Sequence, residues 1–459
     1  MLPNSTRPRV RNATEGPLRG FPRARDARPR FAAGALDPPP SVSRLGRLAP
    51  WYDAAVKKLP LAPKAPLGRR NVPLADQVRE IDKQARPILA VWEITLACDL
   101  ACGHCGSRAG KARPDELTTA EALSLVDQLA ELGVIEVVLI GGESYLREDW
   151  CEIIARIAEH EMEPLLTTGG RGMTPERARA AKAAGLLSAS VSIDGLEATH
   201  DLQRSVAGSF AAALTAMKNL QDADVPVSAN TQINRLSMHE LPAVLETIIE
   251  HGAHSWQIQL TVPMGRAADH PDWILQPYDL LELFPMLDKL ATRCREADVL
   301  LWPGNNVGYF GPYETTLRGT LPRGHTVGCG AGVWGIGIEA NGTIKGCPSM
   351  ATETWGSGNV RDAKLVEIWE RAAPMRFNRG RGIEHLWGFC GSCYYKETCK
   401  GGCTWTAEAI LGKPGNNPWC HHRALELQTA GKRERLVQVE RAPGVPFDQG
   451  RFELIVEKI

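Results

Sequence analysis

The segment PILAVWEITLACDLACGHCGSRAG, residues 87–110, joins an apolar run to three closely spaced cysteines. The run over residues 87–95 is typical of a buried strand, and the loop after it carries Cys98, Cys102 and Cys105. Three thiols in so short a loop indicate a metal centre. A structural zinc site normally takes four protein ligands, whereas an iron–sulfur cubane held by three thiolates leaves one iron free to bind a small molecule. The spacing alone leaves both kinds of site open.

The alternation of apolar runs and amphipathic helices continues along the chain beyond this loop. Further strands are predicted at 134–140, 163–168, 187–193, 226–233 and 255–261. Helices are predicted between them, with the capping box Thr118–Glu121, the pair Thr174-Pro175 and the segment Ser237–Glu240 as start signals. Counting the first strand, six βα units predict an α/β fold, a partial (β/α)6 barrel of the TIM type.

Polar segments follow three of the predicted strands. The cysteine loop follows the first strand, Gly141-Gly142-Glu143 follows the second, and residues 192–195 (Ser-Ile-Asp-Gly) close the fourth. Barrels of parallel strands place their chemistry at the carboxyl ends of the strands. We therefore expect these three segments to meet on one rim.

The cysteine loop, the glycine–glutamate motif and the six-unit barrel together resemble the radical S-adenosylmethionine (radical SAM) superfamily. The resemblance implies that Cys98, Cys102 and Cys105 hold a [4Fe–4S] cluster. The open iron of that cluster would bind the methionyl amine and carboxylate of S-adenosylmethionine. His104 stands where the family has an aromatic residue before the last cysteine, and we place it on the cofactor side of the site.

The glycine–glutamate motif receives a role from the same resemblance. Gly141, Gly142 and Glu143 would bind the methionyl amino group, because glycines let the backbone approach and a carboxylate suits an ammonium. The family often has Pro after this Glu, whereas Ser144 stands here. We interpret Ser144 as a loop variation, since the glycines and the acid remain.

Three more residues match positions near the cofactor. Ser192 and Asp194 fit the pattern that the family places beside the ribose, although an Asx-type turn closing a strand would explain them without any function. Arg204 lies where related enzymes place a basic residue near the cofactor carboxylate. Taken alone, an arginine such as Arg204 is more often a surface residue than a ligand of a cofactor.

Seven further cysteines between residues 329 and 420 resemble the SPASM extension of radical SAM enzymes. The resemblance implies two auxiliary [4Fe–4S] clusters. The first would use Cys329, Cys347 and Cys403, and the second Cys390, Cys393, Cys399 and Cys420. Gly342 is predicted in an Asn-Gly turn of a hairpin that returns the chain to the second of these cysteines. Disulfides or a zinc ribbon would explain only part of the set.

The first auxiliary set is one thiol short. Some members of the family have a cysteine shortly before the position of Cys329, but LPRGHTVG, residues 321–328, contains none. His325 could supply the fourth ligand. The site could instead stay open for water or substrate.

Composition excludes several classes of protein. Lys plus Arg and Asp plus Glu number 53 each, so the formal net charge is zero and no nucleic-acid partner is expected. No apolar run reaches the ~20 residues of a membrane span, and the N-terminus has no signal-peptide pattern. We therefore expect no membrane association and a cytoplasmic location. Twelve cysteines in such a chain are more typical of metal ligands than of disulfides.

Four parts are predicted along the chain. Residues 1–87 form a Pro- and Arg-rich extension that we expect to be a disordered linker, because its composition cannot build a core. The other parts are the barrel at 88–310, a small loop-rich SPASM domain at 311–430 and a C-terminal tail at 431–459.

The resemblance implies an oxidoreductase that reductively cleaves S-adenosylmethionine to a 5′-deoxyadenosyl radical, which removes hydrogen from a substrate. Most enzymes of this kind modify a ribosomally made peptide by a thioether or carbon–carbon crosslink, so we expect a precursor peptide. A tetrapyrrole or another small molecule is the alternative substrate. Pro348 stands where sulfatase-maturing relatives carry Asp, which disfavours formylglycine formation.

The same resemblance implies partners. An electron donor such as flavodoxin or ferredoxin is expected to reduce the cluster. Residues 1–87 do not fit a winged-helix leader-binding module, so a separate leader-binding protein could be needed. A multi-cluster electron carrier is the non-enzyme alternative, but a carrier needs no cluster with an open iron.

Overall fold

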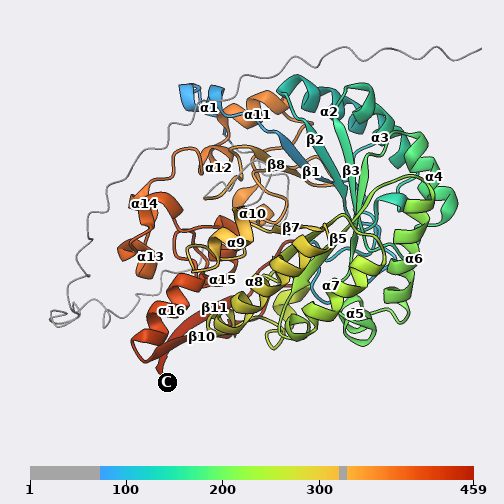
Figure 1. Ribbon diagram of the computed structural model, residues 1–459. Coiled ribbons are helices and arrows are strands. Elements are labelled where there is room, and N and C mark those ends of the chain that lie inside the picture. The colour runs from blue at the N-terminus through green and yellow to red at the C-terminus, as the bar shows by residue number, and fades with distance from the viewer. Residues whose placement is uncertain (1–72, 320–327) are drawn as a thin grey trace, which may run out of the picture. The chain divides into compact units, whose positions relative to one another are not determined.

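The computed structural model describes residues 73–319 and 328–459, all within one compact unit, Ala65–Ile459 (Figure 1). Most of the extension predicted to be a disordered linker therefore lies outside the described residues. Residues 73–87 are ordered, contrary to that prediction: they include helix α1 (Glu80–Gln84). Asp82 on this helix is buried against Arg376 and Arg379, at 2.8 and 3.4 Å. These ion pairs supply the contacts that an apolar core cannot supply for so polar a segment.

Six parallel strands form the predicted partial barrel, in sequence order and each paired with the next. They are β1 (Leu89–Glu93), β2 (Glu136–Ile140), β3 (Glu163–Thr168), β4 (Ser188–Ser192), β5 (Val227–Ile233) and β6 (Ser255–Leu260). In the register, Val91 of β1 pairs with Val138 of β2. Ile258 of β6 pairs with Pro303, which lies on a further strand described below. The predicted α/β fold with a partial barrel is confirmed.

Three further strands extend this sheet at its two edges, which the sequence did not predict. β7 (Leu300–Pro303) pairs with β6, while β8 (Gly335–Ile338) pairs in parallel with β1 and in antiparallel with β9 (Ile344–Lys345). The order is β7-β6-β5-β4-β3-β2-β1-β8-β9. Gly342, with φ of 84°, forms the predicted turn between β8 and β9. The cysteine-rich part of the chain is thus joined to the barrel by backbone hydrogen bonds.

Helices cover the outer face of the barrel strands (Figure 1). They are α2 (Thr119–Leu132), α3 (Trp150–Glu159), α4 (Pro175–Ala183), α5 (Glu197–Arg204), α6 (Ser209–Asp222), α7 (Leu241–Glu250) and α8 (Leu280–Glu296). Thr118 and Thr174 cap α2 and α4 as predicted, each accepting a hydrogen bond from a first-turn amide. Ser237 does not cap α7: it has helical backbone angles and begins the 3₁₀ turn Met238–Glu240 instead.

The helices in the region after β7 are short. They are α9 (Glu314–Arg318), α10 (Thr352–Trp355), α11 (Leu365–Arg371), α12 (Ala373–Arg376), α13 (Gly388–Ser392), α14 (Lys396–Cys399), α15 (Thr404–Leu411) and α16 (His421–Thr429). The other 3₁₀ turns are Ser144–Leu146, Gly265–Asp269, Pro277–Asp279 and Ile383–His385. Such short helices bury little apolar surface of their own.

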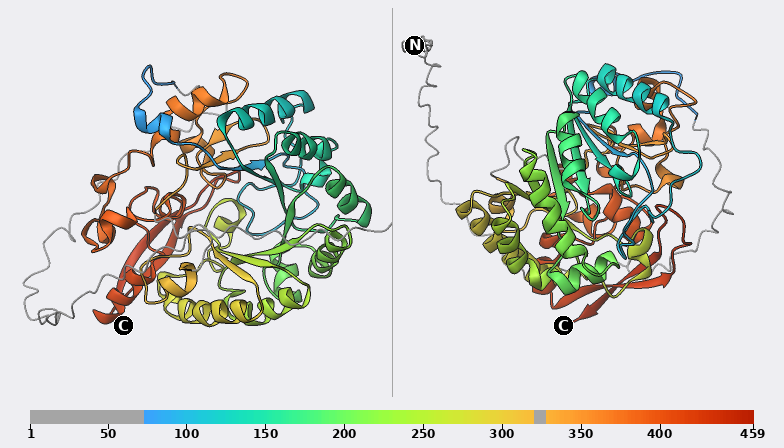
Figure 2. Two further views of the ribbon diagram at one scale, coloured as in Figure 1. Left: turned by 45° about the horizontal axis from the view of Figure 1, so that its top comes forward. Right: turned by 90° about the vertical axis from the view of Figure 1, so that its right-hand side faces the viewer.

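The last residues do not form the plain tail that was predicted. They form an antiparallel hairpin, β10 (Lys432–Glu440) and β11 (Arg451–Lys458), visible from two further sides in Figure 2. Leu436 and Phe452 on its inner face belong to the main hydrophobic core. Leu436, its cross-strand partner Leu454 and Phe452 pack the hairpin against the core. The buried Glu434 adds an ion pair to Arg423 at 2.7 Å.

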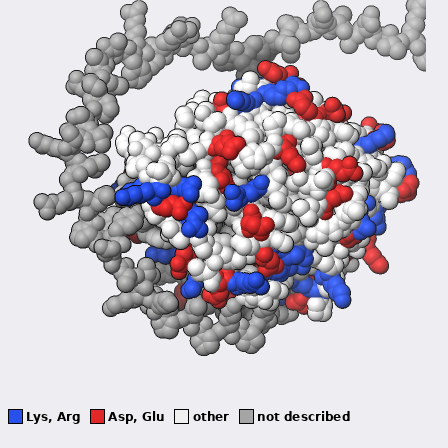
Figure 3. All heavy atoms as spheres, turned by 90° about the horizontal axis from the view of Figure 1, so that it is seen from below, with Lys and Arg blue, Asp and Glu red and all other residues white. Residues whose placement is uncertain are grey.

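The surface is mixed in charge. On the face drawn in Figure 3, basic and acidic side chains alternate without a large area of one sign. No helix among the described residues is long and apolar enough to cross a membrane.

Candidate active site

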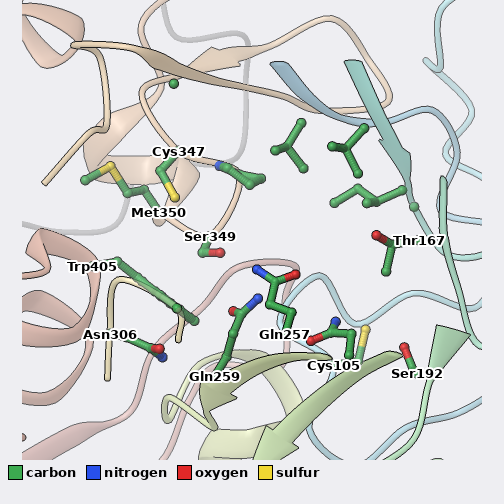
Figure 4. Close-up of a pocket in the computed structure, with 18 of the residues that line it drawn as sticks. Cys105, Thr167, Ser192, Gln257, Gln259, Asn306, Cys347, Ser349, Met350 and Trp405 are labelled. Carbon is green, nitrogen blue, oxygen red and sulfur yellow. The ribbon is translucent and has the colours of Figure 1, made fainter. Parts of the chain in front are cut away.

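One cavity of about 520 Å³ lies inside the barrel. Each of the strands β1 to β6 contributes residues to its wall, and so does the segment after β7. The opposite wall comes from residues 329–350 and 403–405. Figure 4 shows Cys105 and Cys347 on different sides of this space, with Gln257 and Gln259 between them. The cavity therefore connects the two sets of cysteines that the sequence predicted as separate centres.

The cysteine loop after β1 is held at both of its sides. The Cys98 amide donates to the Gly110 carbonyl at 3.1 Å, which closes the base of the loop. The Gly103 amide donates to the Gln203 carbonyl at 2.7 Å, which ties the far side to the end of α5. Cys98, Cys102 and Cys105 all line the cavity. The predicted triplet is thus presented on one wall.

The thiols of this loop lie in a poorly solvated place. Burial raises the pKa of Cys98 to about 12 and also raises that of Cys102. A bound metal reverses this preference, because its positive charge deprotonates a coordinating thiol. None of the twelve cysteines, which all lie among the described residues, forms a disulfide. Within the described ranges, no three His, Cys, Asp or Glu side chains lie close enough to hold a single metal ion. In a cubane, by contrast, the thiolates bind different irons.

The glycines after β2 are required by their neighbours. The amides of Gly142 and Glu143 donate to the carbonyls of Thr95 and Ala97, both at 2.8 Å. A Cβ atom on Gly141 would lie 2.4 Å from the Thr95 oxygen, and one on Gly142 would lie 2.0 Å from the Ala97 oxygen. The role expected for these glycines is to let a cofactor approach the backbone. In the structure they line the cavity, but the absence of a Cβ serves the close approach of two loops.

Glu143 is a buried carboxylate in the cavity wall, 2% exposed. Its two oxygens accept hydrogen bonds from the Thr168 hydroxyl and the Gly169 amide, both at 2.6 Å. Burial raises the pKa of Glu143 to about 7, although both hydrogen bonds oppose this shift. A cation bound beside this carboxylate would offset the cost of its burial.

Asp194 has a different place from the one predicted. It is fully buried and does not line the cavity, whereas Ser192 does. The Asp194 carboxylate contacts an Arg204 guanidinium nitrogen at 2.6 Å and His104 Nε2 at 3.2 Å. Burial alone would raise the pKa of Asp194, but the charges of Arg204 and His104 hold it well below its ordinary value. Asp194 thus positions two cavity-lining bases and offers no free carboxylate to a ribose.

Arg204 itself is buried, 8% exposed, and lines the cavity. One of its nitrogens lies 3.6 Å from the Cys102 sulfur. The sequence placed Arg204 near the cofactor carboxylate, and the structure brings it to the cysteine triplet and to Glu143 on the same wall. It is not a surface arginine.

The second set of cysteines separates into the two predicted groups. Cys329, Cys347 and Cys403 line the main cavity opposite the first loop. The other four, Cys390, Cys393, Cys399 and Cys420, line a second, smaller pocket together with Phe310, Phe389, Tyr395 and His422. Burial raises the pKa of Cys403 to about 12 and that of Cys420 to about 11. His325, the candidate fourth ligand of the first group, lies outside the described residues.

Comparison with known proteins identifies the family. Residues 92–248 match the sequence family described as the Radical SAM superfamily. A protein named AdoMet-dependent heme synthase, from Nitratidesulfovibrio vulgaris, is 30% identical over 362 residues, covering 74% of this chain and 93% of that protein. The chain belongs to the radical SAM superfamily.

Two further comparisons describe this radical SAM chain. A protein named mycofactocin maturase MftC, from Mycobacterium ulcerans, is 30% identical over 344 residues, covering 73% of this chain and 88% of the relative. The crystal structure of Streptococcus suis SuiB bound to S-adenosylmethionine superposes with a TM-score of 0.57 at 17% identity, covering 73% of this chain and 76% of SuiB. At this level of identity, the likeness to SuiB shows a shared fold.

The radical SAM family implies a [4Fe–4S] cluster and S-adenosylmethionine, and the residues present fit both. Three cysteines on one wall would hold the cluster. Glu143, a buried carboxylate facing the same cavity, would accept the cofactor ammonium, and Arg204 would face its carboxylate. The protein is therefore a radical SAM enzyme.

Sequence reasoning missed several residues that shape this site. Arg266, after β6, donates to the Cys102 carbonyl at 2.6 Å and to the Ala109 carbonyl at 3.1 Å, so it holds the cysteine loop from the other side. No sequence signal identified it, because its partners are backbone atoms far away in the chain. Gln257 and Gln259 were detectable: they are polar residues at alternate positions of a strand whose other residues are buried.

Proposed function

We propose that this radical SAM enzyme modifies a ribosomally made peptide, forming a thioether or carbon–carbon crosslink. The observation that supports this most directly is the cavity wall, which offers free side-chain amides. The basic side chains of its described residues already contact Asp194 or the carbonyls of the cysteine loop. A peptide backbone carries amides, whereas a tetrapyrrole substrate carries several carboxylates. The relative named mycofactocin maturase agrees with this class of substrate.

The amides lie on β6 between the two cysteine sets. Within the described part of the chain, the carboxamides of Gln257 and Gln259 have no hydrogen-bond partner, and both face the cavity (Figure 4). Side chains two residues apart on a strand are separated by about 7 Å, which matches the repeat of alternate peptide units in an extended chain. Asn230 on β5 adds a buried side-chain oxygen without a partner. These groups suit the backbone of an extended peptide.

The basic side chains of the described wall are already occupied. Arg204 and His104 both contact the Asp194 carboxylate. Arg266 spends its donors on the carbonyls of the cysteine loop. Among the nitrogens of these described side chains, only Arg204 Nε and His104 Nδ1 have no partner. Once Arg204 faces the cofactor carboxylate, most of several propionate-like groups entering this space would lose hydration without gaining an ion pair.

The chain's own residues would bind and orient the reactants. When bound, the cluster would supply the electron for reductive cleavage of S-adenosylmethionine, the chemistry that makes hydrogen removal from the substrate possible. Glu143 and Arg204 would fix the cofactor at one end of the cavity, and the glutamines would fix the peptide next to it. Trp405, whose indole donates to the Met264 sulfur at 3.2 Å, forms part of the opposite wall and excludes water.

We further propose two auxiliary [4Fe–4S] clusters of the SPASM type. The grouping of three cysteines at the main cavity and four at the second pocket supports them. The first would lie across the cavity from the S-adenosylmethionine site, where it can accept the electron released when the substrate forms its new bond. A flavodoxin or ferredoxin as donor, a separate leader-binding protein and a cytoplasmic location belong to the same proposal.

A second candidate is the modification of a tetrapyrrole. It rests on the relative named AdoMet-dependent heme synthase, of which this chain covers 93%.

The test uses the anaerobically reconstituted full chain with S-adenosylmethionine and dithionite. Each peptide encoded by a short reading frame beside the gene is compared with a carboxylate-bearing tetrapyrrole. We expect one peptide to raise the formation of 5′-deoxyadenosine and to lose hydrogen by mass spectrometry. Loss of carboxyl groups from the tetrapyrrole, with every peptide unchanged, would replace the proposal with the second candidate.

A further inference from the structure

The loop at the tip of the C-terminal hairpin, residues 441–450, reaches the cysteine loop of the barrel. The Phe447 amide donates to the Gly106 carbonyl at 3.0 Å, next to Cys105. The Asp448 carboxylate accepts from Arg108 Nε at 2.8 Å. The hairpin tip therefore holds the residues that directly follow the third cysteine of the triplet.

A second segment ties the same tip to this loop. The Gly265 amide, in the turn after β6, donates to the Asp448 carbonyl at 2.8 Å. A Cβ atom on Gly265 would lie 2.4 Å from the Cys105 oxygen and 2.3 Å from the Gly106 oxygen. Only glycine fits between the cysteine loop and the tip, so the three segments form one tightly packed layer.

The tip also contacts the second set of cysteines. The Lys345 ammonium, two residues before Cys347, lies 3.5 Å from the centre of the Phe447 ring. Phe447 belongs to a small apolar cluster with Met264 and Met350, and Cys329 packs against that cluster together with Cys347. The loop 441–450 therefore contacts residues beside Cys105 and residues beside Cys347.

We propose that Phe447 and Asp448 are positioning residues of the active site. The hairpin tip fixes the cysteine loop and the β8–β9 hairpin, which leads to Cys347, relative to each other across the cavity. The part concerning the cysteine loop relies on the [4Fe–4S] cluster that the family implies. The part concerning Cys347 rests on the proposed function, because it needs the first auxiliary cluster.

The backbone of the tip supports a specific role. Phe447 has a φ of 58°, a left-handed conformation that is unfavourable for a bulky residue. Such a residue persists where surrounding contacts fix it, and these positions concentrate at functional sites. The Asp448 side chain is 3% exposed and its other oxygen accepts from the Val445 amide at 3.0 Å, so the carboxylate cannot turn away from Arg108.

A fixed support of this kind affects iron–sulfur chemistry directly. The potential of a cluster depends on the hydrogen bonds, charges and solvent around its sulfurs. The Phe447 ring packs against the Lys345 cation, which the Glu339 carboxylate at 2.9 Å and the Met350 carbonyl at 2.8 Å also hold. The hairpin tip thus contributes one side of the surroundings of this cation. Its loss is expected to change both cluster environments without removing any ligand.

The experiment compares Phe447→Ala, Phe447→Tyr and Asp448→Asn in the anaerobically reconstituted full chain. Matched controls are Val439→Ala and Glu453→Gln, two exposed positions on the strands of the same hairpin. The measurements are iron content, the midpoint potential of each cluster, the electron paramagnetic resonance spectrum before and after adding S-adenosylmethionine, and the rate of bleaching in air.

We expect Phe447→Ala to bleach about ten-fold faster and to shift the potential of the first auxiliary cluster, as outer contacts of a metal site do. Phe447→Tyr should restore wild-type behaviour, because the ring under Lys345 remains. Asp448→Asn should change the spectrum of the cofactor-binding cluster when S-adenosylmethionine is added. Both controls should match wild type.

Wild-type potentials, spectra and bleaching in Phe447→Ala and Asp448→Asn would overturn the proposal. If Phe447→Ala does not fold, Phe447→Leu decides instead: it keeps an apolar side chain but removes the ring that contacts Lys345, and it should still shift the potential of the first auxiliary cluster. About eight irons in wild type, unchanged by Cys329→Ser, would refute the first auxiliary cluster and with it that part of the proposed function. About twelve irons with unaltered variants would refute only the role of the hairpin tip.

Discussion

The barrel and the cysteine-rich region maintain their structures by different means. Barrel helices such as α2 present a continuous buried stripe to the sheet, from Ala122 to Leu132. In the cysteine-rich region α13 and α14 are five and four residues long, and neither contains a buried residue. Elements without a buried face must be held by something other than an apolar core. The thiolates of Cys390, Cys393 and Cys399, which lie on or next to these helices, are the obvious candidates.

The largest effect we expect separates the two regions by function. Replacing Cys98, Cys102 and Cys105 together with Ala should abolish cleavage of S-adenosylmethionine, because no ligand of the cofactor-binding cluster remains. The fold of the barrel and the auxiliary clusters should persist. Product formation is measured by chromatography of 5′-deoxyadenosine, and iron content provides the control. Undiminished cleavage by the triple variant would remove these cysteines from the site.

The second prediction compares how strongly the barrel and the cysteine-rich region depend on iron for their structure. Stripping the metal anaerobically with a chelator should expose the amides of α13 and α14 to hydrogen exchange, at rates approaching those of unfolded chain. The amides of α2 should stay protected, since an apolar core holds that helix. Reconstitution with iron and sulfide should restore the protection. Equal protection of both regions in the metal-free protein would show that packing alone holds the cysteine-rich part.

The third prediction concerns the cavity that both regions share. Replacing Gln257 and Gln259 with Leu should raise the KM for the substrate peptide at least ten-fold, because each lost amide leaves a peptide group without its hydrogen bond. Cleavage of S-adenosylmethionine without substrate should stay unchanged. Gln428→Leu, at an exposed position of α16, is the matched control. An unaltered KM in the double variant would exclude β6 from peptide binding.

The last effect that we expect is one of stability, and it lies at the junction of the two regions. Glu93 on β1 is buried, and burial together with the charge of Glu339 raises its pKa to about 8. Since the folded state holds this proton more tightly than the unfolded state, the free energy of unfolding should fall as pH rises from about 4.5 to about 8.

The variant Glu93→Gln should lack this part of the pH dependence. The difference in stability between variant and wild type should therefore change by up to about 5 kcal/mol across that window. Urea unfolding at several pH values measures it. Parallel stability profiles of the two proteins would contradict a raised pKa for Glu93.

Local patterns in the sequence were sufficient to predict most of the barrel. The six strands, the caps at Thr118 and Thr174 and the meeting of three polar segments all follow from residues close together in the chain. The position of Asp194 could not be predicted in the same way. Asp194 can be buried because Arg204 and His104, from two other segments, contact its carboxylate. A motif gives only the order of residues along one segment and therefore does not predict such contacts.

The contacts that join the two regions were also beyond the sequence argument. β8 reads GIGI, an alternation of Gly and Ile over only four residues, and nothing in it specifies β1 as the partner strand. The hairpin tip, residues 441–450, contains Pro, Gly and no regular pattern, and its partners lie on the cysteine loop, far back in the chain. The grouping of the second cysteines, in contrast, came from a resemblance, and the structure brings the same groups together.

The pairing of β8 with β1 has a consequence for synthesis of the protein. On the ribosome, β1 emerges early, but the strand that covers its free edge begins only at Gly335. At about 5–20 residues per second, the intervening chain takes on the order of 10–50 s to make. During that time the nascent barrel presents an unpaired strand edge next to its reactive thiols, and such edges recruit other chains. Cells that produce this enzyme therefore have reason to protect it during translation, before any iron is delivered.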